Sequence, residues 1–486
     1  MAAIANPWNS RPIDVHRWSD HPEIVGLVEQ VWRDYFPTER TSGPKPKTSF
    51  RQQLRVLLLD VYVAWLEDPD LCIGVSMSTN YWDTSSRYNA LHISKKIIPI
   101  IGVLVQSGLL DMAKGSYSGP FSRGNRTTRI RASEELQRRF AGLSSNRNDV
   151  GRVQGEEVII LRDANEGQLV EYDDTEETAR MREELTRYNE VIQNAFIDVP
   201  TLEAPRMGDI NVDHHHKLTR RIFNRGDWNF NGRFYGGWWQ QINENARSQI
   251  FINDTPVVEV DFRGLHVTLL AIKAGAEIGG DPYDLPEGLL PGVPPALQRK
   301  FVKRLVLTAI NADAKKVAYR GFRDGFPTDH AGKTITNEQL ELLLAAFLEK
   351  SPHMEALLFD DHGIRLMNID GRITERVHRH FCAQGTPVLS VHDSYIIDYT
   401  RVAELKRVMA EATLAVVGEA LPTSNKFFGL DEPTGRTAQQ VSDYVQWRQT
   451  PRTGEYLRRL AEHEARTGLE VVPYDRLTRK PNDRRL

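Results

Sequence analysis

The sequence predicts an α+β protein, and three observations support this class. The first third of the chain contains apolar residues at helical spacing, followed by a Gly- and Ser-rich segment with strand-like alternation. From about residue 199 to residue 399, short strand-like runs alternate with helical ones, and Pro or Gly separates them. The hydrophobic fraction of 40% and the charged fraction of 26% are typical of a folded globular chain.

Length and composition exclude several classes of protein. A chain of 486 residues suggests about three domains. The 62 Lys and Arg residues and 65 Asp and Glu residues give a net charge of −3, which excludes a uniformly basic coat protein but not local basic patches. The two cysteines lie far apart, which argues against a disulfide framework and a structural zinc site. Neither a signal peptide nor an apolar run of about 18 residues is present, so we expect a cytoplasmic protein with no membrane partner.

The amino-terminal part divides into an extension and a small domain. Residues 1–48 end in T-S-G-P-K-P-K, a linker-like segment. Leu and Val at helical spacing then predict a helix over 49–67, which Asp68-Pro69 ends. A short helix within 84–92, a second apolar helix at 95–107 and a basic hairpin follow. This order resembles a winged-helix domain, which we assign to residues 49–150.

The predicted hairpin carries four arginines with no acidic residue between them. Such a wing can neutralise several DNA phosphates, and two lysines lie at the start of the predicted reading helix. A winged helix that binds protein, or an exposed basic loop, is the alternative. The candidate DNA-binding residues are Arg123, Arg126, Arg129, Arg131, Lys95 and Lys96.

Two further regions flank the predicted core at 205–400. Residues 151–204 read as a hairpin followed by a charged helix from Asp174 to about Asn194, with Thr175 as its cap. Residues 401–486 read as a helical region that begins at Val402 and ends in a basic tail.

Two acidic residues of the core lie at the ends of predicted strands. The segment T-P-V-V-E-V-D-F-R-G-L-H predicts a strand that ends at Asp261, directly before a helix. The segment T-P-V-L-S-V-H-D-S-Y-I-I-D-Y predicts a strand, a turn and a strand, with Asp393 at the turn. A carboxylate between apolar arms is unfavourable unless it meets a cation. Together the two could hold a pair of Mg²⁺ ions for phosphoryl transfer, although either alone could be an ordinary turn or cap residue.

A basic helical face lies between these two segments. In the segment 297–322, Arg299, Lys303, Leu307 and Asn311 fall on one side of a helix, because residues three and four apart are neighbours. Basic groups near the positive end of a helix can bind a triphosphate. The alternative is a solvated helix face.

Taken in order, these segments resemble the palm and fingers motifs of family A DNA polymerases and of the related phage-type single-subunit RNA polymerases. The matching elements are Asp261 with Leu265 and His266, then Arg299 with Lys303, then His392-Asp393-Ser394. Upstream, G-D-W-N-F-N-G-R-F-Y at 226–235 is similar to the D-W/F-R-G-R-x-Y element of the RNA enzymes, with two extra residues. The family's Tyr-Gly pair is replaced by Asn311-Ala312.

The resemblance implies a role for each matching residue. Asp261 and Asp393, with the backbone carbonyl of Phe262, would hold two Mg²⁺ ions, for which Mn²⁺ could substitute. Arg299 and Lys303 would bind the triphosphate, with Leu307 and Asn311 on the same nucleotide-binding face. His266 takes the position of the Glu that excludes the ribose 2′-hydroxyl, where it could act as a steric gate or instead bond that hydroxyl. Arg233 would contact the template–product backbone.

The sequence therefore predicts a template-dependent nucleotidyltransferase with a right-hand, polymerase-like palm and fingers core. Its partners would be a DNA template, a primer or nascent strand, and nucleoside triphosphates. We expect a compact DNA-directed DNA polymerase of the replication or priming type, for example from a mobile element. A single-subunit RNA polymerase or primase is one alternative, and a non-catalytic winged-helix replication initiator or regulator is another. Residues 151–204 are a candidate thumb, and no proofreading exonuclease is expected.

Overall fold

The computed structural model describes residues 4–36, 48–119, 124–164, 167–208, 210–277, 280–432 and 437–473. It combines helices with several small sheets, so the chain belongs to the mixed α and β class that the sequence predicts. The chain divides into two compact units, Met1–Glu157 and Val158–Leu486. Within the described ranges, no helix is long and apolar enough to cross a membrane.

The first unit contains a four-stranded sheet packed against helices. Three of its strands are antiparallel in the order β3-β5-β4, and β1 pairs with β3 in parallel. A two-stranded pair, β2 (Arg17–Trp18) and β6 (Gly151–Arg152), completes the strands. The remaining elements are β1 (Ser10–Pro12), β3 (Cys72–Val75), β4 (Leu110–Ala113), β5 (Thr128–Ala132), α1 (Pro22–Tyr35), α2 (Phe50–Glu67), α3 (Ile97–Gln106) and α4 (Glu134–Ala141).

Local sequence explains where the helices of this unit begin and where one is missing. Ser49 and Gln52 form a reciprocal capping box that starts α2 at the predicted place. The short helix expected within 84–92 is wrong, because this segment consists of turns. The side chain of Asn89 there bonds both the N–H and the C=O of Ile93, each at 2.8 Å, and so replaces helical backbone bonds.

The second unit is built on two sheets. The larger has the order β15-β16-β14-β13-β8, and β17 also pairs with β14. The smaller has the order β12-β11-β7, in which β7 is parallel to β11. The strands are β7 (Ile159–Leu161), β8 (Ile197–Asp198), β11 (Thr219–Asn224), β12 (Asp227–Gly236), β13 (Phe251–Ile252), β14 (Thr255–Phe262), β15 (Leu389–Val391), β16 (Ser394–Asp398) and β17 (Thr423–Asn425), with a separate pair β9 (Arg206–Met207) and β10 (Ile210–Asn211).

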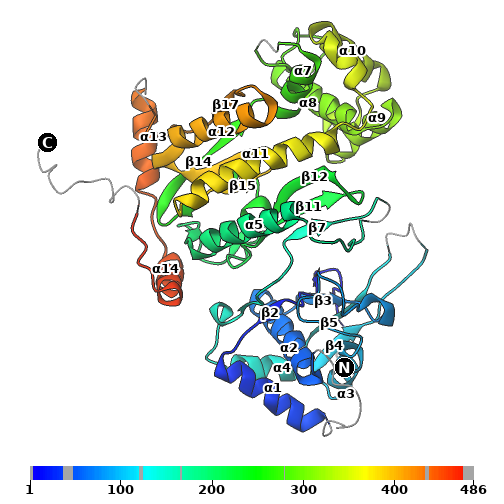
Figure 1. The fold of residues 1–486 in the computed structure, drawn as a ribbon, viewed down its shortest axis with the longest axis vertical. Coiled ribbons are helices and arrows are strands. Elements are labelled where there is room, and N and C mark those ends of the chain that lie inside the picture. The colour runs from blue at the N-terminus through cyan, green and yellow to red at the C-terminus, as the bar shows by residue number, and fades with distance from the viewer. Residues whose placement is uncertain are drawn as a thin grey trace, which may run out of the picture. The chain divides into compact units, whose positions relative to one another are not determined.

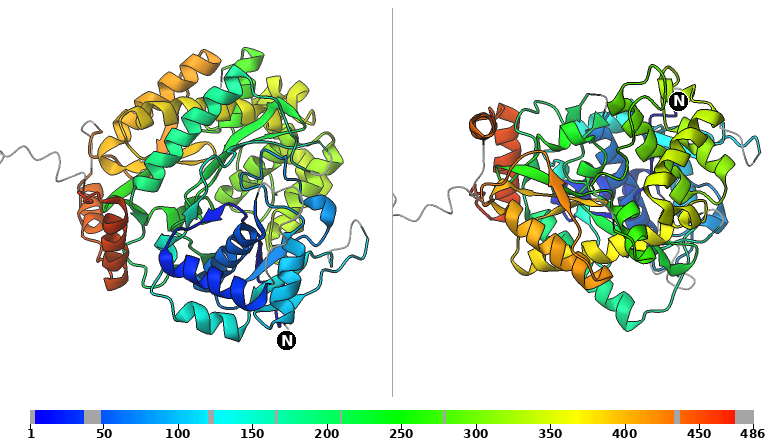
Figure 2. Two further views of the ribbon diagram at one scale, coloured as in Figure 1. Left: turned by 60° about the horizontal axis from the view of Figure 1, so that its bottom comes forward. Right: turned by 90° about the horizontal axis from the view of Figure 1, so that it is seen from above.

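The long helix α11 (Gly363–Ala383) runs through the middle of this unit and packs on β12, α12 and α5. Figure 1 shows α7 to α10 gathered toward the amino-terminal end of α11, and Figures 1 and 2 show α13 and α14 together at another edge. The other helices are α5 (Glu176–Asn194), α6 (Glu244–Arg247), α7 (Leu265–Ala274), α8 (Pro295–Asn311), α9 (Lys315–Asp324), α10 (Asn337–Lys350), α12 (Val402–Val417), α13 (Ala438–Arg448) and α14 (Gly454–Thr467).

The helix α5 confirms one local prediction, and the segment before it differs from another. Thr175 caps α5 and pairs with Thr178 in a capping box, as its sequence suggests. Among the described residues, the hairpin expected over 155–173 is short: it has a bridge between Arg162 and Leu169, with hydrogen bonds of 2.9 Å from the Val170 N–H to the Leu161 carbonyl and from the Asp163 N–H to the Gln168 carbonyl. The strand β7 also pairs with β11, which is distant in sequence. Tertiary pairing with β11 therefore takes the first arm of this segment, while the local hairpin persists around residues 161–170.

Candidate active site

The two acids that the sequence singles out lie on neighbouring strands. β14 and β16 are antiparallel, and Asp261 is the register partner of Ser394. Asp393 directly precedes Ser394, in the two-residue turn between β15 and β16. The Phe262 N–H donates a hydrogen bond to the Asp393 carbonyl at 3.4 Å. The strand pairing thus brings the two acids together at one end of the sheet.

Asp261 is in an environment that disfavours its charge. Burial, and then the negative charge of Asp393, raise the pKa of Asp261 to about 7, while the positive charge of Lys303 opposes this rise. Its Oδ1 is buried and has no hydrogen-bond partner within the described part of the chain. An ionised carboxylate in this position needs a cation or further donors to offset its desolvation.

The turn that carries Asp393 has an unusual backbone conformation. His392 precedes it with φ of 57°, in the left-handed region that non-glycine residues seldom adopt. Its ring lies 5.7 Å from that of Tyr235, edge to face. Such backbone strain costs on the order of 1–3 kcal/mol and is frequent at functional sites.

A second acid of β14, Glu259, stabilises the turn between β15 and β16 through a bond with Ser394. The Ser394 hydroxyl donates to Glu259 Oε1 at 2.6 Å. Arg247 holds the same carboxylate through two bonds of 2.9 and 2.8 Å. Because residues 259 and 261 lie on one side of the strand, these bonds support the side that carries Asp261.

The basic helix predicted between the acids is α8, and most of its predicted face lines one hollow. Lys303, Leu307 and Asn311 line an open cavity of about 540 Å³ between α8 and α9, together with Lys300 and Arg304. Asn311 also donates to the Leu307 carbonyl at 2.6 Å.

Arg299 lies one turn before Lys303 and has a different environment. Its Nε donates a hydrogen bond to Asp281, and its guanidinium lies 5.9 Å from the ring centre of Tyr283. An incoming triphosphate would have to replace Asp281 as its partner.

His266 is the second residue of α7 and contacts Arg233. Burial, and then the charge of Arg233, lower the pKa of His266 to about 4, so its imidazole is neutral at neutral pH. Arg233 Nη2 lies 3.2 Å from His266 Nε2. A guanidinium can only donate, so Nε2 accepts and the proton of the neutral ring is on Nδ1. Arg233 is thus anchored inside the site.

Asp370, on α11, is a site residue that our sequence reasoning missed. It is fully buried and forms an ion pair with Arg233 Nε. Its position on the helix offered a signal, since it shares a face with the buried Leu366, Ile373 and Val377. An acid on an apolar helical face implies a buried cationic partner.

Tyr283 is a second missed residue, and the sequence gives no pattern that would have found it. It lies in an irregular segment between α7 and α8, it is buried, and its hydroxyl has no partner among the described residues. Burial first, and then the charges of Asp281, Asp393 and Asp261, raise the pKa of Tyr283. A buried hydroxyl without a partner near the two acids is a donor available to a substrate.

The acid pair fits a divalent cation by its donor chemistry. Carboxylate and carbonyl oxygens are the ligands that Mg²⁺ and Mn²⁺ prefer, and the orphaned Asp261 Oδ1 needs a positive partner. Across the described ranges no cluster of three or more His, Cys, Asp or Glu side chains could hold a metal. Any metal would therefore bind to the two acids with backbone, water or substrate oxygens.

The candidate DNA-binding residues of the first unit differ in their surroundings. Arg131 forms ion pairs with Asp70 and Asp111, while Arg126 donates to the Lys114 carbonyl at 3.0 Å. Arg129 donates to the carbonyls of Pro7, at 3.3 Å, and Thr127, at 3.1 Å. The two lysines precede α3: Lys95 is exposed, and Lys96 lies 5.0 Å from the ring centre of Phe50. Arg123 lies outside the described residues.

Comparison with solved structures gives a weak similarity to a polymerase domain. No family model matches the chain. No curated protein matches it either. A solved structure that it resembles is the POL domain of Pol1 from M. smegmatis in complex with DNA primer-template and dNTP, with 12% sequence identity and a TM-score of 0.27. The match covers 52% of this chain, which spans about half (51%) of that one.

Proposed function

We propose that this protein is a template-dependent nucleotidyltransferase, in the form of a compact DNA-directed DNA polymerase. The observation that carries the proposal is the convergence of Asp261 and Asp393 on neighbouring strands, with the charge of Lys303 acting on Asp261. Two acids beside a basic helix are the arrangement that phosphoryl transfer to a triphosphate requires.

In this proposal, Asp261, Asp393 and the Phe262 carbonyl hold divalent cations. When bound, Mg²⁺ would activate the attacking hydroxyl and neutralise the charge on the leaving pyrophosphate. The raised pKa of Asp261 supports this assignment, since a cation would relieve the repulsion between the two carboxylates.

The nucleotide would bind between α8 and the acids. Lys303 and Arg299 would bind its phosphates, and the hollow along α8 leaves space beside Leu307 and Asn311. The neutral His266 would lie near the sugar, where its bulk discriminates between ribose and deoxyribose. These roles are those that the motif order implies.

For the first unit, we propose a winged-helix module that binds DNA. Its order of α2, β3, α3, β4 and β5, with the antiparallel sheet β3-β5-β4, includes the long helix, the second apolar helix and the hairpin strands of such a domain, although the short helix expected within 84–92 is replaced by turns. Basic groups such as the half-buried Arg126 and the exposed Lys95 would contact phosphates. The thumb role of residues 151–204 stays a prediction.

A second candidate function is RNA synthesis. Ser394 follows His392-Asp393, as in the single-subunit RNA polymerases, and it bonds Glu259 in the site. The element at 226–235 is also of the RNA polymerase type and supplies Arg233. These two features favour the RNA enzymes, whereas the position of His266 favours DNA synthesis.

Primer extension tests the proposal directly. The full chain is incubated with a primed DNA template and Mg²⁺, with dNTPs or NTPs in separate reactions. Extension with dNTPs alone is expected. Extension with NTPs alone would establish the second candidate, and no extension in either reaction would leave a DNA-binding protein without catalysis.

The Asp393→Asn variant connects any synthesis to this site. It keeps the size of the side chain but removes its charge, so we expect loss of extension by at least about a hundredfold with DNA binding retained. Glu411→Gln, an exposed change on α12, is the matched control. Full extension by Asp393→Asn would contradict the metal-ligand assignment.

A further inference from the structure

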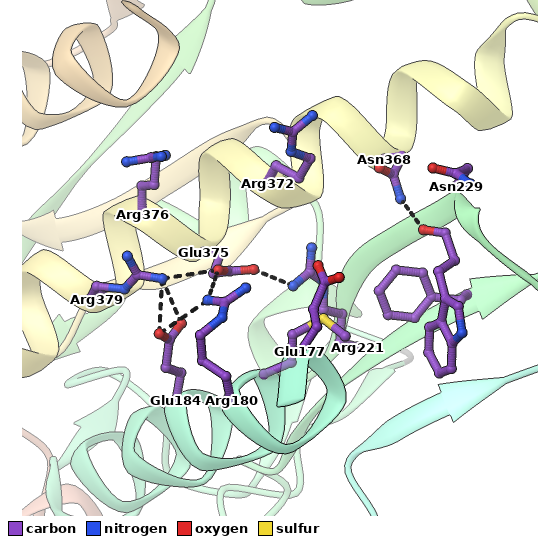
Figure 3. Close-up of a pocket in the computed structure, with 13 residues that line it drawn as sticks. Glu177, Arg180, Glu184, Arg221, Asn229, Asn368, Arg372, Glu375, Arg376 and Arg379 are labelled. Carbon is purple, nitrogen blue, oxygen red and sulfur yellow. Dashed lines mark hydrogen bonds and ion pairs between the residues drawn. The ribbon is translucent and has the colours of Figure 1, made fainter. Parts of the chain in front are cut away.

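The second unit contains a basic hollow that takes no part in the site described above. It has a volume of about 730 Å³ and is bounded by α5, α11 and the paired strands β11 and β12 (Figure 3). Five arginines and three glutamates line it, so positive charges exceed negative ones by two. These residues are Arg180, Arg221, Arg372, Arg376, Arg379, Glu177, Glu184 and Glu375.

The inner wall of the hollow is a fixed ionic network. Glu375 accepts hydrogen bonds from Arg180 at 2.6 Å, from Arg379 at 3.1 Å and from Arg221. Glu184 accepts from Arg180 at 3.2 Å and from Arg379 at 3.0 Å (Figure 3). These two glutamates are therefore occupied in holding the arginines in place.

Arg221 makes the floor of this network rigid. The residue is 3% exposed, and its Nε donates to the Gly232 carbonyl at 2.9 Å. Its guanidinium also lies 5.1 and 5.2 Å from the ring centres of Phe223 and Phe234. Because these contacts fix the buried Arg221, its bond to Glu375 also helps to position the other arginines that bond to that carboxylate.

Two arginines on the outer wall of the hollow are not part of this ionic network. Arg372 and Arg376 are exposed on α11, and no ion pair or hydrogen bond of either is found within the described part of the chain. Figure 3 shows both without an interaction with any other residue drawn. The two acids of the network, Glu184 and Glu375, are already paired, and the third glutamate of the hollow, Glu177, leaves its charge net positive, so the two cations would bind an anion from outside.

The geometry of α11 separates this surface from the catalytic one. Arg365, Arg372, Arg376 and Arg379 follow each other at steps of seven, four and three, so they form one stripe along the helix. Asp370, which pairs with Arg233 in the candidate active site, projects from the opposite face because it is about half a turn away from this stripe. The stripe is therefore a distinct surface.

The length and the aromatic end of the stripe indicate the class of ligand. From Arg365 to Arg379 the helix rises about 21 Å, at about 1.5 Å per residue, which is longer than a single small anion needs. At one end the Phe230 ring lies 4.7 Å from the guanidinium of Arg365 and 5.2 Å from that of Arg225. Arginines for phosphates and an aromatic ring for bases are the elements of a single-strand binding surface.

We propose that this hollow and the α11 arginine stripe (Arg365, Arg372, Arg376 and Arg379) bind the phosphate backbone of a single-stranded nucleic acid outside the catalytic pocket. Arg372 and Arg376 make the direct phosphate contacts, and Glu375 and Arg221 position the surrounding arginines. Binding at this surface does not require nucleotide transfer. The test therefore measures nucleic-acid affinity and not enzymatic activity.

The experiment uses the full chain with the double change Arg372→Ala and Arg376→Ala. Affinity for a fluorescent single-stranded DNA is measured by anisotropy over a series of salt concentrations. Loss of two phosphate contacts should lower the slope of log affinity against log salt by about 1.4, since each contact contributes about 0.7 for single strands. The control is Arg407→Ala with Arg458→Ala, two exposed arginines on α12 and α14, which should leave the slope unchanged.

Three outcomes would overturn the proposal. The first is an unchanged slope in the Arg372 and Arg376 variant. The second is competition by inorganic tripolyphosphate as strong as that by an equal phosphate concentration of oligonucleotide, which would assign the hollow to a small anion. The third is equal competition by a poly-glutamate peptide, which would assign it to an acidic protein. Photo-crosslinking of a halogenated oligonucleotide to peptides of α11 is the result expected if the proposal holds.

Discussion

Asp370 on α11 is completely buried, and its one ion-pair partner among the described residues is Arg233 on β12. Burial raises the pKa of Asp370 to about 6, although the charge of Arg233 opposes that rise. Its Oδ1 has no hydrogen bond within the described part of the chain. The pair fixes the guanidinium that contacts His266. An ion pair between a helix and a strand thus orients a side chain of the candidate active site.

Breaking this pair from one side should destabilise the second unit. We expect Asp370→Leu to lower the free energy of unfolding by about 3–5 kcal/mol, because it leaves the buried charge of Arg233 without an acidic partner. Urea unfolding measures the change. Replacing both residues, as Asp370→Leu with Arg233→Met, should recover most of the loss. A loss below about 1 kcal/mol in the single variant would contradict the buried pair.

The two acids of the site are predictable because they follow local rules. Asp261 lies at the end of an apolar strand and Asp393 occupies a turn between two apolar arms, so the amino-acid pattern places each acid, although only the two together with the basic helix between them indicate a catalytic site. The strand register that brings them together is a long-range property, and only the order of the motifs indicated it.

Other features leave no local pattern in the sequence for physical reasons. The wing arginine Arg131 has no acid beside it in sequence, yet Asp70 and Asp111 meet it across the fold. Tyr283 lies in an irregular segment between α7 and α8, without a helical or strand-like spacing. Side-chain pairing between distant elements leaves no periodic signal in the chain.

Metal affinity should depend on pH through Asp261. Its raised pKa of about 7 means that a proton occupies the site below neutral pH and competes with a cation. We expect the affinity for Mn²⁺, measured by titration calorimetry, to fall about tenfold per pH unit below pH 7 and to level off above it. In Asp393→Asn this dependence should shift to lower pH, because the neighbouring negative charge is gone. An affinity independent of pH between 5 and 7 would contradict the assignment.

His266 should influence which sugar is accepted. The neutral ring is held by Arg233 in a fixed orientation, so a change to Ala opens space without removing a charge. We expect His266→Ala to reduce the preference for dNTPs over NTPs by about tenfold or more, measured as the ratio of kcat/KM values in primer extension. His266→Gln retains bulk and should preserve more of the preference. Equal preference in the parent chain and both variants would remove His266 from sugar selection.

We expect two arginines of the predicted wing to have different roles: Arg126 binds DNA, and Arg131 stabilises the fold. Arg126→Ala should weaken DNA binding and lower its salt dependence, by about 0.9 in slope for duplex DNA. Arg131→Ala should instead lower the thermal stability of the first unit, because it leaves the buried Asp111 without its partner. Anisotropy and thermal unfolding of the two variants give this contrast. A reversed pattern would mean that Arg131 leaves its acids to bind DNA.

His378 should make the second unit sensitive to acid. Its ring is fully buried, stacks on Tyr188 at 3.8 Å between ring centres, and has no hydrogen bond on either nitrogen within the described part of the chain. Burial lowers the pKa of His378 to about 3, whereas an unfolded histidine titrates near 6.5. The folded state therefore binds fewer protons than the unfolded state between these values, so stability is complete above pH 6.5 and falls as the pH decreases. Each such histidine contributes up to about 1.4 kcal/mol per pH unit to this loss. The variant His378→Phe keeps the stacking ring and removes the proton site, so its free energy of unfolding should fall less steeply between pH 6 and pH 4 in urea titrations. Identical slopes for the variant and the parent chain would show that this histidine is not the source of the acid sensitivity.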